Sequence, residues 1–228
     1  MQLDILTIFP QMFEGPFSHS IIKRAKDKKL VEINLHNIRD FATDKHKRVD
    51  DYQYGGGSGM VMMIEPIANC IGHLKGKNAY DEIIYMTPDG ELFNQKMANY
   101  FSTTKRIMIL CGHYKGIDER IRENYITREI SIGNYVLSGG EMAAIVFTDS
   151  VVRLLPGVLN DETSALSDSF QDDLLSPPVY TRPSDFRGWK VPEILLSGND
   201  KIISDWRLER SIERTRIRRP DLLSEQDG

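Results

Sequence analysis

Three loops that contain glycine are the first segments of this sequence that could bind a ligand. They span residues 87–90 (TPDG), 111–116 (CGHYKG) and 132–140 (IGNYVLSGG), and each follows an apolar run typical of a strand. In an open α/β sheet, ligands bind beyond the carboxyl ends of the strands, where glycine lets the backbone approach them closely. One such loop is better explained as a tight turn, but three after successive strands favour a ligand-binding cleft. None matches the glycine patterns of dinucleotide-binding or P-loop proteins.

A run of arginines near the C-terminus is the second segment that could do chemistry. Within residues 206–219, Arg207, Arg210, Arg214 and Arg218 recur at spacings of three and four, which places them on one face of a helix. Such a face could neutralise phosphates along an RNA backbone. It could equally be a solvated face with internal Glu–Arg pairs, and the pattern alone does not decide between the two.

The elements that must position these loops alternate between strand and helix patterns. Strands are predicted at residues 3–9, 31–38, 82–87, 106–111 and 126–132, and helices at 18–29, 64–74, 94–101 and 140–155. This alternation predicts an α/β domain with a largely parallel sheet. Residues 39–59 are polar, include a basic cluster at 45–48 and end in a glycine-rich stretch, so a long loop is predicted there.

The character of the chain changes after Gly157. Residues 160–176 are acidic and contain no basic residue, which is typical of a linker or a mobile lid. We therefore predict a domain over residues 1–160, a linker or lid over 161–176, and a small helical domain over 177–228.

The composition excludes several classes of protein. No apolar stretch approaches the roughly 20 residues of a membrane span, and the N-terminus lacks the features of a signal peptide, so a cytoplasmic protein is expected. Cys70 and Cys111 do not have the spacing of a disulfide framework, and the histidines form no ligand pair, so no metal site is predicted. A net charge of −4 argues against a generic polyanion binder, although the arginine run is locally basic.

Seven motifs, in order along nearly the whole chain, resemble the bacterial tRNA (guanine-N1)-methyltransferase family, TrmD. This family acts on guanosine at tRNA position 37. The motifs lie at residues 49–57, 116–120, 131–141, 149–159, 168–170, 180–183 and 195–199.

The resemblance implies a particular fold and methyl donor. The fold would be a SPOUT-type α/β domain with a parallel sheet and a C-terminal trefoil knot, followed by a small, mostly helical domain. The protein would be a homodimer with active sites at the subunit interface. S-adenosylmethionine would bind in the knot, against Tyr85, Met86, Thr87, Pro88, Gly112, Tyr114, Gly116, Ser131, Ile132, Gly133, Asn134, Tyr135, Val136, Leu137, Gly139 and Gly140.

The same resemblance implies catalytic and RNA-binding residues. Asp168 matches the family's general base, which removes the N1 proton of guanine, and Arg153 matches the arginine that stabilises negative charge on O6. Without the resemblance, Asp168 is better explained as one more solvated acid. The target base must leave its stack, and the glycines of residues 55–59 would receive it. The tRNA would contact Arg24, His46, Arg48, Asp50, Gly55, Gly56, Gly57, Gly59, Arg182, Arg207 and Arg214.

Three positions depart from the family pattern. Lys115 stands where the family usually has glutamate, Asn134 replaces an aspartate, and Ala143 replaces a proline. The charge reversal at Lys115 argues against a requirement for Mg²⁺, but the sequence does not exclude one. It also leaves two alternatives open: a catalytically weakened RNA-binding relative, and a methyltransferase of the same class that acts on another RNA position.

Overall fold

The computed structural model describes residues 1–159 and 168–224. The chain divides into two compact units, Met1–Asn160 and Asp161–Gly228, which are described separately below.

The N-terminal unit is built on a five-stranded parallel sheet in the order β2-β1-β6-β5-β7. The strands are β1 (Gln2–Thr7), β2 (Glu32–Asn37), β5 (Glu82–Leu92), β6 (Arg106–Cys111) and β7 (Arg128–Ser131). The predicted α/β class and parallel sheet are confirmed, because every pairing in this sheet is parallel.

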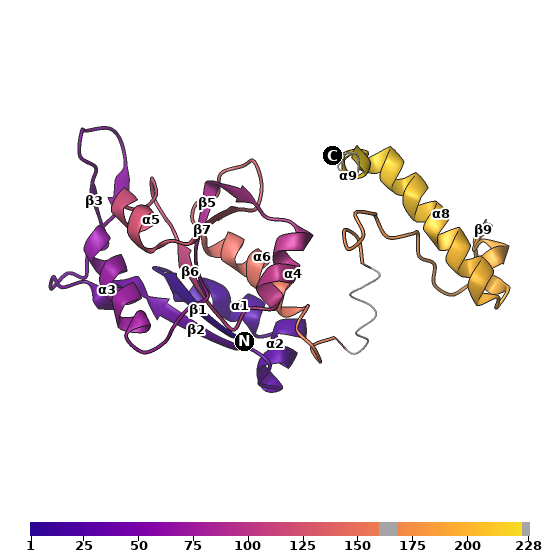
Figure 1. Cartoon of the computed structure of the whole chain (residues 1–228), viewed down its shortest axis with the longest axis horizontal. Coiled ribbons are helices and arrows are strands. Elements are labelled where there is room, and N and C mark those ends of the chain that lie inside the picture. The colour runs from indigo at the N-terminus through magenta and orange to yellow at the C-terminus, as the bar shows by residue number, and fades with distance from the viewer. Residues whose placement is uncertain (160–167, 225–228) are drawn as a thin grey trace. The chain divides into compact units, whose positions relative to one another are not determined.

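Helices cover both faces of the sheet (Figure 1). One face packs against α1 (Glu14–Phe17), α2 (Ser20–Asp27), α4 (Gln95–Ser102) and α6 (Glu141–Val152), and the other against α3 (Ile64–Lys75) and α5 (Glu119–Tyr125). Short 3₁₀ helices lie at Pro10–Phe13 and Ile38–Phe41. The run Arg106–Cys111 shows why both faces are covered: Ile107, Ile109 and Cys111 point into one hydrophobic cluster, and Met108 and Leu110 point into the other.

Two predictions about local structure were wrong. The strand predicted to end at Thr87 continues to Leu92, and its pairing with β7 shifts register between Met86 and Glu91. Gly90 permits this break, since a Cβ there would lie 2.5 Å from backbone atoms of Glu129 and Ile130. Residues 87–90 therefore form an irregularity within β5, where a turn was expected.

The segment predicted as one long loop contains a β-hairpin. Strands β3 (Asp50–Tyr52) and β4 (Met60–Met62) pair antiparallel, and the glycines between them form its tip. Gly55, Gly56, Gly57 and Gly59 all have positive φ, which side chains disfavour. Burial of Met62 in the cluster on the α3 face explains why a polar segment is ordered here.

The first and last elements of this unit are joined by a buried polar contact. Glu141 is the first residue of α6 and is only 1% exposed, and its Oε1 accepts a hydrogen bond from Thr7 Oγ1 (2.8 Å). The same hydroxyl accepts from the backbone N–H of Phe9 (2.9 Å). A carboxylate at this position also faces the positive end of the α6 dipole.

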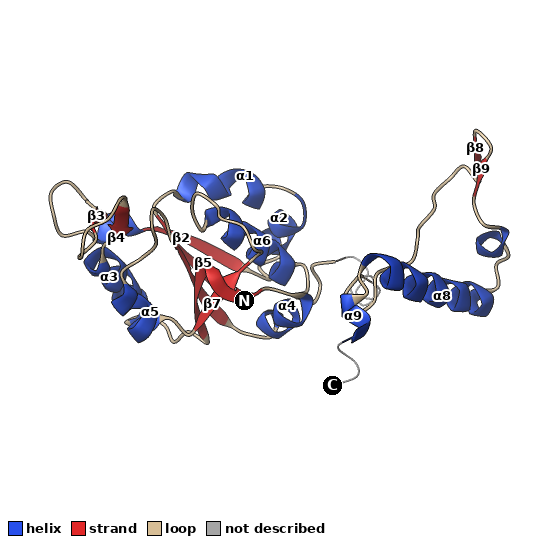
Figure 2. Cartoon of the chain, turned by 90° about the horizontal axis from the view of Figure 1, so that it is seen from above, coloured by secondary structure: helices blue, strands red, loops and turns tan. Residues whose placement is uncertain are grey.

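The C-terminal unit consists of a long helix and short elements around it (Figure 2). They are the hairpin β8 (Asp185–Phe186) and β9 (Trp189–Lys190), a 3₁₀ helix (Glu193–Leu196), α8 (Asp200–Arg218) and α9 (Asp221–Ser224). The arginine run therefore lies on a helix, as its spacing predicts.

The predicted lid is described only in part, because residues 161–167 lie outside the described residues. Residues 168–176 belong to the C-terminal unit, where the N–H of Leu175 donates to Thr215 Oγ1 on α8 (2.8 Å). In the described ranges, no helix is long and apolar enough to cross a membrane.

Candidate active site

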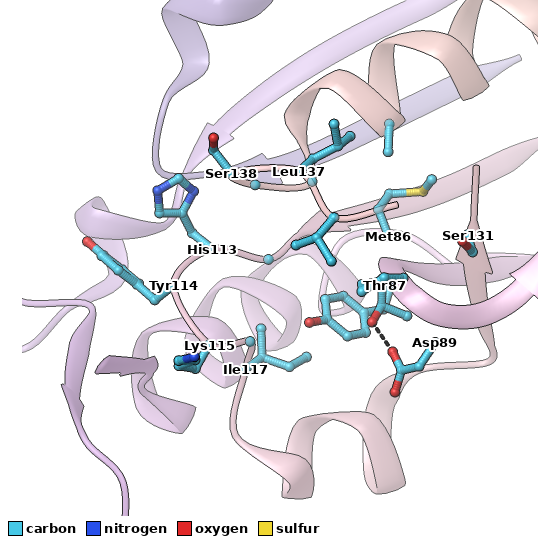
Figure 3. Close-up of a pocket in the computed structure, with 18 of the residues that line it drawn as sticks. Met86, Thr87, Asp89, His113, Tyr114, Lys115, Ile117, Ser131, Leu137 and Ser138 are labelled. Carbon is cyan, nitrogen blue, oxygen red and sulfur yellow. Dashed lines mark hydrogen bonds between the residues drawn. The ribbon is translucent and has the colours of Figure 1, made fainter. Parts of the chain in front are cut away.

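A cavity of about 570 Å³ lies at the carboxyl ends of β6 and β7 and beside the irregular part of β5, where the three glycine-containing segments meet (Figure 3). That volume falls in the usual range for a small-molecule site. All the residues predicted to bind the donor line this cavity except Asn134. Across the cavity from Met86, Thr87 and Asp89 lie His113 and Tyr114.

Glycine is required where the loops touch one another. A Cβ on Gly112 would lie 2.8 Å from the ring and hydroxyl of Tyr85, and one on Gly140 would lie 2.9 Å from the Cα of Cys111. The N–H of Gly140 donates to the carbonyl of Gly112 (2.8 Å), so the loops after β6 and β7 are hydrogen-bonded directly. These glycines therefore bring separate loops together, which goes beyond forming individual tight turns.

The cavity includes four charged residues outside the set predicted to bind the donor. Asp89, Lys115, Glu119 and Arg122 line it. Glu119 and Arg122 come from α5, which was not predicted because only one of its residues, Ile121, is buried. The other lining residues that were not predicted are Gln53, Val61, His113, Ile117, Ile130, Ser138 and Ala143.

The surroundings of three polar side chains in the cavity shift their pKa values. Burial raises the pKa of Tyr85 above its ordinary value. Hydrogen bonds from Thr87 and Arg122 hold the pKa of Asp89 below its ordinary value, so this carboxylate is ionised at neutral pH. Tyr114 has a raised pKa, mainly because it is partly buried and secondly because it faces Asp50.

The hairpin that carries the predicted base-binding glycines adjoins the cavity. The N–H of Lys115 donates to the carbonyl of Met60 (3.0 Å), and the N–H of Met62 donates to the carbonyl of Gly116 (3.0 Å). The stem of Lys115 packs on Gly59, where a Cβ would lie 2.9 Å from its Cγ. The structure thus brings Asp50 and Gly59 next to the cavity, whereas Gly55, Gly56 and Gly57 do not line it.

The other RNA-binding residues predicted in this unit are dispersed. Arg24 lies on α2, on the opposite face of the sheet from the hairpin. His46 and Arg48 lie in the segment before β3, where Arg48 Nε donates to Asp44 (2.8 Å). Arg153, which was predicted as a catalytic residue, is the C-cap of α6 and is half-buried.

The C-terminal unit has its own cavity, of about 780 Å³. Asp168, Arg182 and Arg207 all line it, together with Tyr180 and apolar side chains. Of the other arginines on the predicted face of α8, Arg214 is half-buried, and Arg210 forms ion pairs with Glu209 (2.9 Å) and Glu213. On the arginine face of the helix, Arg207 therefore lines the cavity, whereas Arg210 pairs with glutamates of the same helix.

No cluster of metal-ligating side chains was found in residues 1–159 and 168–224. Both cysteines are buried and unpaired. Burial raises the pKa of the Cys70 thiol to about 12, which suits an inert core residue.

Comparisons with known proteins identify the family to which this chain belongs. The family described as tRNA (guanine-1)-methyltransferase TrmD matches the chain over residues 1–225. A tRNA (guanine-N(1)-)-methyltransferase of Flavobacterium johnsoniae is 62% identical over 225 residues, which is 99% of this chain and 100% of that protein. Proteins of the same name are 61% identical in Bacteroides fragilis (99% and 100% covered) and 60% identical in Cytophaga hutchinsonii (97% and 94%). The chain belongs to the tRNA (guanine-1)-methyltransferase family, TrmD.

Proposed function

We propose that the protein transfers a methyl group from S-adenosylmethionine to N1 of guanosine in tRNA, at position 37, and that it does so in the cytoplasm. The observation that carries this proposal is the cavity formed by the three glycine loops, in a chain that belongs to the family.

The cavity suits the donor in size and in shape. Its volume of about 570 Å³ accommodates a nucleoside with an amino-acid tail, and Gly112 and Gly140 allow the loops that form it to approach one another closely. When bound, S-adenosylmethionine supplies a methyl group that its sulfonium has already activated. The work left to the protein is to orient the donor, exclude water and activate the acceptor.

The acceptor nitrogen needs a base. N1 of guanine carries a proton and is a poor nucleophile until that proton leaves, so we assign its removal to the carboxylate of Asp168. Loss of the proton pushes negative charge onto O6, and we assign stabilisation of that charge to Arg153. The position of Asp168 in a cavity that also contains Arg182 and Arg207 supports this role, because arginines beside it suit an RNA phosphate.

We further propose how the RNA is held. The hairpin meets the donor cavity at Gly59, and its tip, with four glycines at residues 55–59, leaves space for a flipped base. Arg182, Arg207, Arg214, Arg24 and Arg48 would contact phosphates, with His46 and Asp50 close to the base. The acidic segment 161–176 would close over the bound nucleotide as a lid.

The proposal includes the SPOUT-type knot and a homodimer. Support for the knot comes from the chain after β7, which returns to pair with the loop after β6 through His113 and Gly139. Support for the dimer comes from an apolar surface on α6 and the adjoining 3₁₀ helix, where Met12, Met142 and Val146 are each more than 40% exposed. A second copy of this chain would cover it.

Transfer of labelled methyl groups to tRNA transcripts tests the function. The wild-type protein should methylate a transcript with G37 and leave one with A37 unmodified, and mass spectrometry of the digested nucleosides should find 1-methylguanosine. Equal methylation of both transcripts would contradict the proposed position. Methyl groups on another atom would contradict the proposed chemistry.

Two variants test the base. Asp168→Ala should lower the methylation rate by a factor of about 10²–10⁴, the usual contribution of general-base catalysis. Asp172→Ala is the matched control, because Asp172 is an exposed acid of the same segment that does not line the cavity. If both variants work at the wild-type rate, Asp168 is not the base.

A further inference from the structure

One guanidinium joins three elements at the edge of the donor cavity. Arg122, on α5, donates from Nε and Nη2 to Glu129 on β7 (2.7 and 2.6 Å) and from Nη2 to Asp89 on β5 (2.8 Å). A third carboxylate, that of Glu119, lies 3.6 Å from Nη1. The side chains of Arg122 and Glu129 are 23% and 29% exposed, so this bidentate, charge-assisted pair is partly shielded from water, unlike an ordinary surface ion pair.

The same guanidinium lies against a cavity side chain. Its carbon is 5.6 Å from the ring centroid of Tyr85, which is within the range of a cation–π contact. At the other end of this ring, the hydroxyl lies against Gly112 and Gly116, where a Cβ would approach to 2.8 and 3.6 Å. The Tyr85 ring is therefore held between Arg122 and the loop after β6.

Asp89 links the arginine to the irregular segment 87–90 within β5. One carboxylate oxygen accepts from Arg122, and the other accepts from the hydroxyl of Thr87. Figure 3 shows this second bond at the edge of the cavity. Arg122 therefore contacts, directly or through one partner, residues from two of the three loops that form the site.

We propose that Arg122 is a positioning residue for the methyl donor, which fixes the shape of the cavity through Tyr85 and Asp89. This inference rests on the proposed function, since it assumes that the cavity binds S-adenosylmethionine.

A positioning role and a purely electrostatic effect of Arg122 predict opposite changes in donor affinity when this residue is replaced. Loss of its positive charge leaves Asp89, Glu119 and Glu129 without their shared cation, and on electrostatic grounds alone this would favour a donor that carries a positive sulfonium and ammonium. Loss of positioning instead frees the Tyr85 ring and the segment 87–90 of β5, which weakens donor binding. The sign of the change in affinity therefore separates the two roles.

The test measures binding of S-adenosylmethionine by calorimetry and the kinetics of tRNA methylation for Arg122→Met. We expect the Kd and the KM for the donor to rise about tenfold or more, the scale of one lost charged hydrogen bond, while kcat at saturating donor changes much less. Arg122→Lys should recover part of the affinity, because it restores the charge and one donor. Unchanged or tighter donor binding by Arg122→Met would overturn the proposal.

Arg120→Met is the matched control. Arg120 lies on the same helix, and among the described residues its guanidinium pairs with the N-cap residue Asp118 (2.7 Å); it does not line the cavity. Its donor affinity should equal that of the wild type; an equal loss in both variants would show a general effect on α5 and overturn the proposal.

A second variant guards against misfolding. If Arg122→Met does not unfold cooperatively, Glu129→Gln removes one partner of the guanidinium and should raise the Kd in the same direction by less. An unchanged Kd for Glu129→Gln would then overturn the inference. Failure of the wild-type protein to bind S-adenosylmethionine at all would instead contradict the proposed function.

Discussion

The two units of this protein differ in what holds them together. In the N-terminal unit, apolar side chains from both faces of the sheet form two buried clusters, and the site is built largely from backbone at the ends of the strands. In the described part of the C-terminal unit, only Ser211 and Thr215 are buried, while Trp189, Leu196 and Ile217 are each at least 60% exposed.

The difference separates two ways of making a binding site. A cavity of close-packed backbone loops needs a rigid core beneath it, because small shifts would close it. A surface that binds through exposed arginines needs charge and reach more than internal packing. We expect the first unit to determine the stability of the protein and the second to determine its attraction for RNA.

The largest expected effect tests the core. Phe147 is fully buried on α6 and packs against Phe93 and Phe101 at 5.3 and 5.1 Å between ring centroids. Phe147→Ala should lower the free energy of unfolding by about 3–5 kcal/mol, measured by denaturant titration, because it leaves a cavity in a packed cluster. Trp189→Ala, a larger truncation at a side chain that is 74% exposed, should change it by less than about 0.5 kcal/mol. A comparable loss of the free energy of unfolding in both variants would contradict the proposed difference between the two units.

An intermediate effect tests the charged surface. Arg207→Ala should weaken tRNA binding and reduce the slope of log K against log salt by about one, as expected when one phosphate contact is lost. Arg216→Ala, an exposed arginine on the same helix outside the cavity, should change the slope less. Filter binding over a range of salt concentrations measures both slopes, and equal slopes would show that the cavity has no special part in binding.

The smallest expected effect concerns acid and the buried carboxylate of Asp4, on β1. Burial tends to raise its pKa, but hydrogen bonds with His36 (2.7 Å) and from Tyr80 (2.8 Å) outweigh burial and hold that pKa below 3.8. A lowered pKa stabilises the folded state above about pH 3.8, and this stabilisation is lost as the pH falls towards the folded-state pKa.

Thermal unfolding of Asp4→Asn across this pH range checks the sign. The variant should be less stable than the wild type at pH 7, and the gap should narrow on acidification below 3.8. A gap that stays constant or widens in acid would contradict the lowered pKa.

The regular elements could be predicted because their burial is periodic. The run Arg106–Cys111 forms a strand at the predicted residues, and the spacing of the arginines correctly indicated α8. The hairpin β3–β4 and α5 could not be predicted, because each fixes its position with very few buried side chains, such as Met62 and Ile121. Pattern arguments need several such residues in succession.

The location of the site could be predicted from the sequence, but one of its charged clusters could not. Glycine loops after strands indicated where a ligand would bind, and the family resemblance supplied the residues around it. The cluster of Arg122 with Asp89 and Glu129 could not be found this way, since its members are 33 and 7 residues apart and meet only when β5 and β7 pair. Long-range ion pairs leave no periodic trace in a sequence.

The hydrogen bond between Thr7 and Glu141 has a consequence for the order in which the protein is made. Its two residues are 134 positions apart, so at a synthesis rate of about 5–20 residues per second roughly ten seconds pass on the ribosome before the second follows the first. Throughout that interval β1 lacks α6, one of the helices that cover one of its faces. Because the lining of the cavity extends to Ala143 on α6, the cavity is among the last features of its domain to be completed.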